Sequence, residues 1–195
     1  MYWLLIVIII VFIAVIRRNR KPADTIFEPP EKQAGRIGEK IASDIIRRVL
    51  REDDILLTNV NISYDSRPAE LDNVVINSYG VFIIEVKNDI GYIVGEENDF
   101  EWQKYKTTDA GNTYEKTVKN PIKQVKRQIY ILAHYLDYYG VKVWVSGYAI
   151  LLHNNSPVKS SYILTNEADI DHAIHTPGRS RLSKATVSKI AELLK

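Results

Sequence analysis

Apolar residues occur along this chain in two kinds of run, short blocks typical of strands and longer stretches with helical spacing. The clearest short blocks are Val74–Ile76 and Val81–Ile84, which flank the turn-forming residues Ser78-Tyr79-Gly80. Two such blocks around a short turn predict a β-hairpin. Further strand-like runs are residues 55–63, 142–152 and 162–164, and residues 89–95 predict a turn followed by a strand that contains Tyr92 and Val94.

Helical spacing predicts three helices. The first covers residues 33–52, where an apolar residue recurs at every fourth position: Ile37, Ile41, Ile45 and Val49. The second starts at Asn120-Pro121, a favoured cap and first residue, and its core-facing stripe is Ile122, Val125, Ile129, Leu132 and Leu136. The third covers residues 182–194. Residues 99–112 are polar and predict a loop held in place by Trp102.

The N-terminal segment has a different character. Residues 1–16 are all apolar or aromatic, and a basic cluster follows directly: Arg17, Arg18, Arg20 and Lys21. A secretory signal peptide has its positive charge before the apolar core and a small-residue cleavage site after it, and both are missing. We predict a transmembrane helix over residues 1–16, a basic juxtamembrane linker over 17–32 and a C-terminal domain over 33–195. The protein would then be a single-pass protein of the cell membrane with its C-terminal domain in the cytoplasm. Because 16 apolar residues make a helix of about 24 Å against a hydrocarbon core of ~30 Å, a buried core helix or a peripheral anchor is the alternative.

The composition excludes several kinds of site. The chain has no cysteine, which rules out disulfide frameworks, thiolate zinc sites and cysteine nucleophiles. Its four histidines show no zinc-ligand spacing. The net charge is +2, but without the basic cluster the remainder is about −2. Any nucleic-acid-binding surface must therefore be local.

Three charged residues are expected to meet at one end of the hairpin. Asp72 begins its first strand, and Glu85 and Lys87 end its second. An antiparallel pair brings the start of one strand beside the end of the other, and residues two apart in a strand share a face. Two carboxylates suit Mg²⁺ or Mn²⁺, and a lysine beside such an ion can hold an attacking water. A solvated cross-strand charge pair is the alternative.

Other candidate residues lie on the predicted helices. Glu39 lies beside the apolar stripe of the first helix, where it can border a helix–sheet contact or face solvent. Gln124 flanks the stripe of the second helix. A positive patch, Lys123, Lys126 and Arg127, lies on the opposite side of that helix. Such a patch suits phosphate contact, or it is simply a solvated helix face.

These residues occur in the order and spacing of a known family. The motifs are Gly35-x-x-Gly38-Glu39, Glu70-Leu71-Asp72, the stretch Gly80–Asn88 with Gly91 after it, and Asn120-Pro121-x-x-Gln124. Together they cover roughly residues 33–136 and resemble the nuclease-related domain (NERD) family, which looks like a branch of the PD-(D/E)xK nuclease superfamily. The resemblance implies an α/β fold, a mixed β-sheet flanked by helices with a restriction-endonuclease-like core. The superfamily's proline before the metal-binding aspartate is replaced here by Leu71.

The resemblance also implies roles for individual residues. Asp72 and Glu85 would bind Mg²⁺ or Mn²⁺, and Lys87, Glu39 and Gln124 would be catalytic. We expect a membrane-anchored, metal-dependent nuclease that hydrolyses phosphodiester bonds of nucleic acid, DNA more than RNA, with the positive patch on the backbone phosphates. One alternative is a catalytically inactive nuclease-fold module that binds nucleic acid or protein at the membrane. Another is a membrane-tethered interaction domain with no nucleic-acid role.

Overall fold

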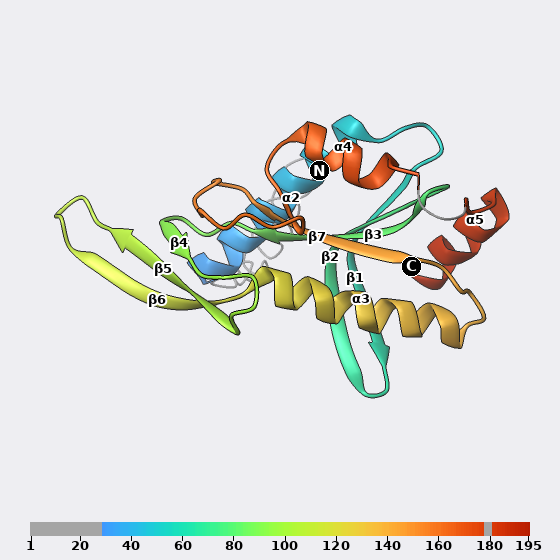
Figure 1. Cartoon of the computed structure of the whole chain (residues 1–195), viewed down its shortest axis with the longest axis horizontal. Coiled ribbons are helices and arrows are strands. Elements are labelled where there is room, and N and C mark those ends of the chain that lie inside the picture. Colours follow the sequence, from blue (N-terminus) through green and yellow to red (C-terminus); the bar gives the residue numbers. More distant parts are fainter. Residues whose placement is uncertain (1–28, 178–180) are drawn as a thin grey trace, which may run out of the picture. The chain divides into compact units, whose positions relative to one another are not determined.

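The fold is organised around one five-stranded sheet (Figure 1). The computed structural model describes residues 29–177 and 181–195. The elements are α2 (Pro30–Val49), β1 (Ile55–Tyr64), β2 (Arg67–Asn77), β3 (Gly80–Lys87), β4 (Tyr92–Val94), β5 (Glu101–Thr107), β6 (Thr113–Lys119), α3 (Pro121–Tyr138), β7 (Val145–Leu151), β8 (Ile163–Leu164), α4 (Glu167–His175) and α5 (Lys184–Leu193). The predicted transmembrane segment 1–16 lies outside the described residues. Within the described ranges, no helix has the length and apolar character needed to cross a bilayer.

The sheet is mixed, with strand order β1-β2-β3-β7-β8. β1, β2 and β3 pair antiparallel, whereas β3–β7 and β7–β8 pair parallel. Two tight turns connect the antiparallel strands. Asp65 and Ser66 both have positive φ, 51° and 58°, the geometry of a two-residue hairpin turn, and Ser78-Tyr79 form the turn expected from the sequence. The α/β class and the mixed sheet flanked by helices are therefore confirmed.

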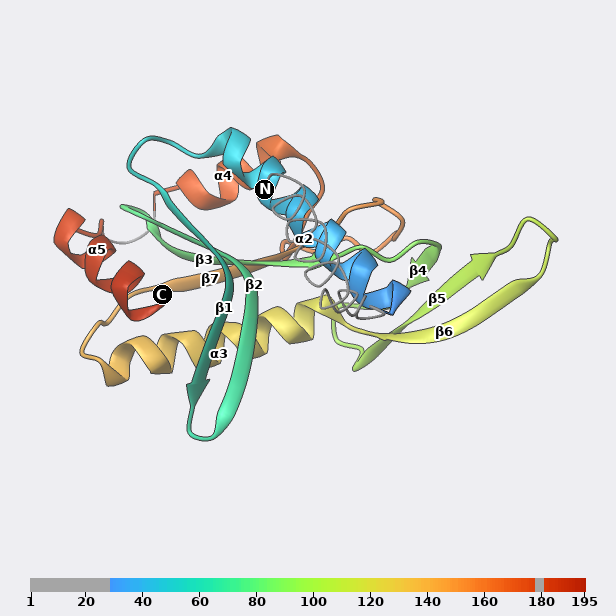
Figure 2. The ribbon, with the colours of Figure 1, turned by 180° about the vertical axis from the view of Figure 1, so that it is seen from behind.

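Helices cover both faces of this sheet within residues 34–195 (Figure 2). On one face, Ile131, Leu132 and Leu136 of α3 and Ile190 of α5 pack against β1, β2, β3 and β7. On the other face, the packed helices are α2 and α4, through Ile46, Ile170 and Ile174. The sheet is thus buried on both sides, which explains why β2 and β3 contain continuous apolar runs rather than an alternating pattern.

The buried face of α2 is rotated from the predicted one. Ile37 and Ile41 are 46% and 45% exposed, whereas Gly38, Ala42 and Ile46 are buried. The reason is close packing: a Cβ placed on Gly38 would lie 2.5 Å from the Cβ of Asn88. A helix that approaches so closely has to present its smallest residues, and the larger isoleucines turn outward.

The predicted loop or excursion over residues 99–112 was wrong for half of the segment. Residues 101–107 form β5, which pairs with β4 and β6 in a three-stranded sheet, and residues 108–112 connect β5 to β6. Beyond the pairing with β4, the hairpin continues as a two-stranded ribbon (Figure 1), in which residues 106–107 and 113–117 are exposed. A ribbon without a buried face has no apolar alternation, so the sequence gives no strand signal there. Trp102 is buried as expected, at 1% exposure, and packs against Ile122.

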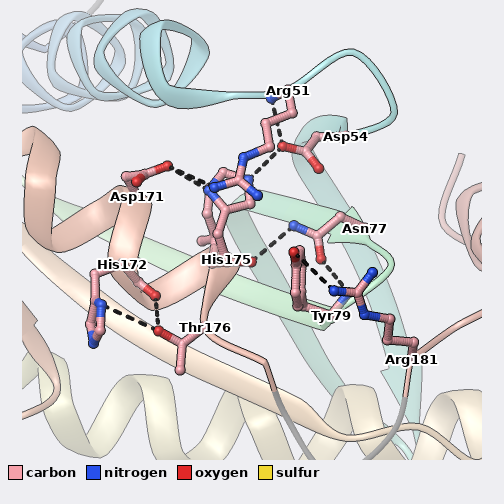
Figure 3. A network of polar contacts seen from close by, with 10 residues as sticks. Arg51, Asp54, Asn77, Tyr79, Asp171, His172, His175, Thr176 and Arg181 are labelled. Atoms are coloured by element: carbon pink, nitrogen blue, oxygen red, sulfur yellow. Dashed lines mark hydrogen bonds and ion pairs between the residues drawn. The ribbon is translucent and has the colours of Figure 1, made fainter.

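Helix α4 is held to the α2–β1 connection by a buried histidine (Figure 3). His175 Nδ1 lies 2.6 Å from Asp171 Oδ1, and its Nε2 lies 2.8 Å from Asp54 Oδ2. The side chains of His175 and Asp54 are only 3% and 4% exposed. Asn77 completes the contact by donating to the carbonyl of Ile174 at 3.0 Å. This polar network therefore connects α4 to the α2–β1 connection and to the end of β2.

Replacing His175 with alanine should lower the free energy of unfolding by about 3 kcal/mol, because the buried carboxylate of Asp54 then keeps only the hydrogen bond from the Arg51 N–H. Urea denaturation measures the change. The matched control is His172→Ala, an exposed histidine on the same helix, with an expected change within about 0.5 kcal/mol. Equal losses for the two variants would contradict a structural role for the buried histidine.

Candidate active site

The site begins where the pairing of β2 with β3 ends. The ladder between these strands runs from Asn77↔Gly80 to Asn73↔Ile84. At the next position, a side chain replaces the backbone as the hydrogen-bond acceptor: Asp72 Oδ2 accepts from the Val86 N–H at 2.7 Å. Asp72 lies in the middle of β2 and not at its start, because the strand extends to Arg67 to pair with β1. The expected meeting of this residue with the end of β3 is nevertheless present.

Glu85 is the most buried acid of the site, at 2% exposure. Both of its oxygens have partners. Oε1 lies 2.7 Å from the Lys87 ammonium, and Oε2 accepts from Gln128 Nε2 at 2.7 Å. Gln128 also donates to the backbone carbonyl of Glu70 at 3.0 Å. Gln128 was not among the predicted site residues, although its position one turn after Gln124 beside the same apolar stripe could have indicated it.

Lys87 is positioned from two elements. Besides Glu85 on its own strand, its ammonium donates to Gln124 Oε1 on α3 at 2.9 Å. The register of α3 depends on its predicted cap: Asn120 Oδ1 accepts from the Ile122 N–H at 2.9 Å. The amide of Asn120 also donates to three carbonyls, those of Glu96, Glu97 and Asp99. The cap thus fixes where α3 begins and hence where Gln124 meets the lysine.

Glu39 approaches from α2. The close contact of Gly38 with Asn88 holds α2 against the residue that follows Lys87, and Glu39 is next to Gly38 in sequence. One turn on, Ser43 donates to Asn73 Oδ1 at 2.7 Å and fixes the helix to β2. Glu39 is partly buried, and the desolvation raises its pKa. Repulsion from Glu70 and Glu85 raises it further, so Glu39 is electrostatically part of the site.

Asp72 has a strongly raised pKa, from 3.8 to about 7. Burial is the largest cause, followed by repulsion from Glu85. The Val86 N–H and the ammonium of Lys87 oppose the rise, whereas Glu39 adds to it. Three acids from α2, β2 and β3 therefore influence one another around a single lysine. A poorly hydrated group of acids with a shifted pKa is typical of functional sites.

Comparison with protein families identifies this arrangement. A family model described as nuclease-related domain (NERD) matches residues 34–152, more than half of the chain. The chain belongs to the NERD family. All the predicted metal-binding and catalytic residues, from Glu39 to Gln124, lie inside the matched region of the NERD domain. Searches among curated proteins and among solved structures gave no match.

Nuclease-like domains commonly use divalent metals, so the donor set of this NERD domain has to be compared with that chemistry. Across residues 29–177 and 181–195, no three His, Asp or Glu side chains are grouped as a metal cage. Mg²⁺ does not need one, because it is usually held by one or two carboxylates and keeps several waters. Asp72 and Glu85 provide two such carboxylates, and their mutual repulsion is the condition that a cation relieves. The residues therefore fit Mg²⁺ or Mn²⁺.

The positive patch of the NERD domain is largely engaged within the protein. Lys126 pairs with Glu97 at 3.0 Å and lies 4.6 Å above the ring of Tyr162. Arg127 donates to the carbonyl of Pro68 at 2.9 Å. Lys123 is exposed and forms no ion pair with the acids of the described part of the chain. The structure thus joins Asp72, Glu85, Lys87 and Gln124 with Glu39 nearby, whereas the patch is a separate surface of α3.

In metal-free protein, Asp72 should make the folded state less stable as the pH rises. Its folded pKa of about 7 exceeds its ordinary 3.8, so the folded state holds the proton more tightly than the unfolded chain. The stabilisation is fully present below pH 3.8 and is lost as the pH rises toward about 7. Asp72→Asn should not show this loss, and urea denaturation in EDTA measures the widening difference from wild type.

The control for this measurement is Asp44→Asn, an exposed acid on α2. Its stability should follow that of wild type across the same pH range. Parallel curves for wild type and Asp72→Asn would contradict the raised pKa.

Proposed function

We propose that this NERD domain hydrolyses phosphodiester bonds of nucleic acid with Mg²⁺ or Mn²⁺, in DNA processing, from a restriction-endonuclease-like core. The observation that carries the proposal is the lysine ammonium held between Glu85 and Gln124, beside Asp72. Carboxylates with an adjacent ammonium are suited to placing a water and a phosphate together. Family membership supports a nuclease-related role.

Each residue of the candidate site has a role in this mechanism. Asp72 and Glu85 would hold the metal, which supplies Lewis acidity and neutralises charge on the phosphate. Lys87 donates a hydrogen bond that orients the attacking water. Gln124 holds the Lys87 ammonium in place, and Gln128 fixes the carboxylate of Glu85. The nearby charge of Glu39 raises the pKa of Asp72.

A binding module without catalysis is the second candidate. It is favoured by one specific feature, because both oxygens of Glu85 are already engaged, by Lys87 and Gln128. Metal binding therefore requires the Glu85–Lys87 pair to open or to share an oxygen. In a binding module this pair remains closed, and the domain keeps its fold for nucleic acid or protein.

We also propose that residues 1–16 anchor the protein in the cell membrane with the NERD domain in the cytoplasm. The support is the uninterrupted apolar segment followed by the basic cluster. Deleting residues 1–21 should move the protein to the soluble fraction while the NERD domain stays folded, as measured by fractionation and circular dichroism. A truncated chain that no longer folds would show that the segment is part of the core.

Lys87→Ala should reduce Mg²⁺-dependent cleavage by the full-length chain by roughly 10² to 10³-fold, the usual cost of removing one positioned hydrogen-bond donor at a reacting centre. Gel analysis of labelled DNA and RNA, with Mg²⁺ or EDTA, measures the rates. The matched control is Lys142→Ala, whose exposed side chain lies 3.9 Å from Asp137, at the other end of α3 from Gln124. Equal metal-dependent cleavage by both variants would place the chemistry elsewhere.

Gln124→Ala should slow cleavage by about tenfold or more, since it removes one hydrogen bond to a charged group. The free energy of unfolding should change by less than about 0.5 kcal/mol, because the side chain lies outside the apolar core. Wild-type cleavage by this variant, in an assay where Lys87→Ala is inactive, would remove Gln124 from the site.

A further inference from the structure

A basic groove lies between α2 and β1, on the side of the site away from α3. The groove has a volume of about 320 Å³. Its lining has three cations and two acids, together with three polar residues: Arg36, Lys40 and Arg47, Glu39 and Asp44, and Ser43, Thr58 and Asn59. We call it the α2–β1 groove. Neither the family motifs nor the mechanism above assigns it a role.

The cations of the groove form one row along α2. Arg36, Lys40 and Arg47 are separated by four and seven residues, spacings that place them on the same helix face. From the first to the last, the row extends over about 16 Å at ~1.5 Å per residue. One strand of a duplex presents a phosphate roughly every 3.4 Å of axis, so several phosphates can lie along the row.

Two residues that line the groove, Asn59 and Glu39, connect it to the acids of the site. In the β1–β2 pairing, Thr58 is opposite Asn73 and Val60 is opposite Leu71, which leaves Asn59 opposite Asp72. Asn59 has a left-handed φ of 54°, a local break in β1 at this position. Glu39 lines the groove and also raises the pKa of Asp72. A polyanion lying in the groove would therefore end at the proposed metal site.

The groove is a better phosphate surface than the positive patch. Two cations of that patch already have partners within the protein, Lys126 with Glu97 and Arg127 with the Pro68 carbonyl. In contrast, Lys40 and Arg47 are exposed and form no ion pair with the acids of the described residues. The groove is also recessed beside the acids of the site, which suits a single strand of nucleic-acid backbone better than a flat bilayer surface.

We propose that the α2–β1 groove binds the sugar–phosphate backbone of nucleic acid, with Lys40 and Arg47 as phosphate contacts that lead the strand to Asp72 and Glu85. This inference rests on the proposed function because it supplies the substrate path to the same site. In this proposal α2, rather than α3, is the main phosphate-binding helix.

The test is equilibrium binding of a fluorescent 20-base-pair DNA to the full-length chain in EDTA, across a range of salt concentrations. Lys40→Ala and Arg47→Ala should each reduce the slope of log K against log[salt] by about 0.9. If the variant and wild type have the same K at 1 M salt, this change in slope corresponds to about eightfold weaker binding by the variant at 0.1 M. Circular dichroism checks that each variant is folded.

The matched control is Arg48→Ala, the next residue on the same helix. Arg48 does not line the groove and pairs with Glu167 at 3.1 Å. Its affinity and salt slope should equal those of wild type. A difference between neighbouring arginines cannot come from net charge alone.

Two results would overturn the inference. Arg47→Ala could bind with wild-type affinity and slope while cleavage still depends on Lys87, which would leave the proposed function intact. Alternatively, Lys40→Ala and Arg47→Ala could lose affinity for vesicles of anionic phospholipid and keep it for DNA, which would make the groove a membrane contact. Groove-dependent binding by a wild-type chain that does not cleave DNA or RNA would support the groove and reject the nuclease.

Discussion

The whole site depends on the partners that hold the buried carboxylate of Glu85. A carboxylate at 2% exposure has lost nearly all its water, and the cost of that loss has to be offset by partners. The ammonium of Lys87 neutralises one oxygen, and the amide of Gln128 binds the other. One partner belongs to β3 and the other to α3, so the same interaction that makes burial possible also fixes α3 against the sheet. Gln124 follows from this, because one turn of α3 separates it from Gln128.

The neighbouring acid is under the opposite constraint. Asp72 has one backbone hydrogen bond, from Val86, but it lies near two other acids, and burial with repulsion raises its pKa to about 7. A site of this kind is destabilising without a cation, a cost that proteins commonly accept where function requires it. The groove beside α2 adds positive charge on the open side of the same acids. These features support the proposal that the site takes a cation and a polyanion.

Much of this arrangement could be predicted from the sequence, since it depends on local signals. The hairpin, the Asn120 cap and the convergence of Asp72 with Glu85 and Lys87 follow from turn residues, strand periodicity and antiparallel pairing. The face of α2 could not be predicted, because two small residues, Gly38 and Ala42, pack more closely than the isoleucines that dominate an apolar pattern. The β5–β6 ribbon has no buried face to mark it. The contacts of Gln128 and His175 join segments 43 and 121 residues apart, and only the folded chain brings those together.

The central claim is that Asp72 and Glu85 hold a divalent cation between them, for which the Glu85–Lys87 pair has to open or to share an oxygen. The most direct test is anomalous scattering from crystals of the protein soaked in Mn²⁺. The account predicts one strong peak within coordination distance of both carboxylates, with Lys87 still hydrogen-bonded to Gln124. A closed Glu85–Lys87 pair with no peak at Asp72, in crystals whose Asp72 is deprotonated well above pH 7, would contradict it.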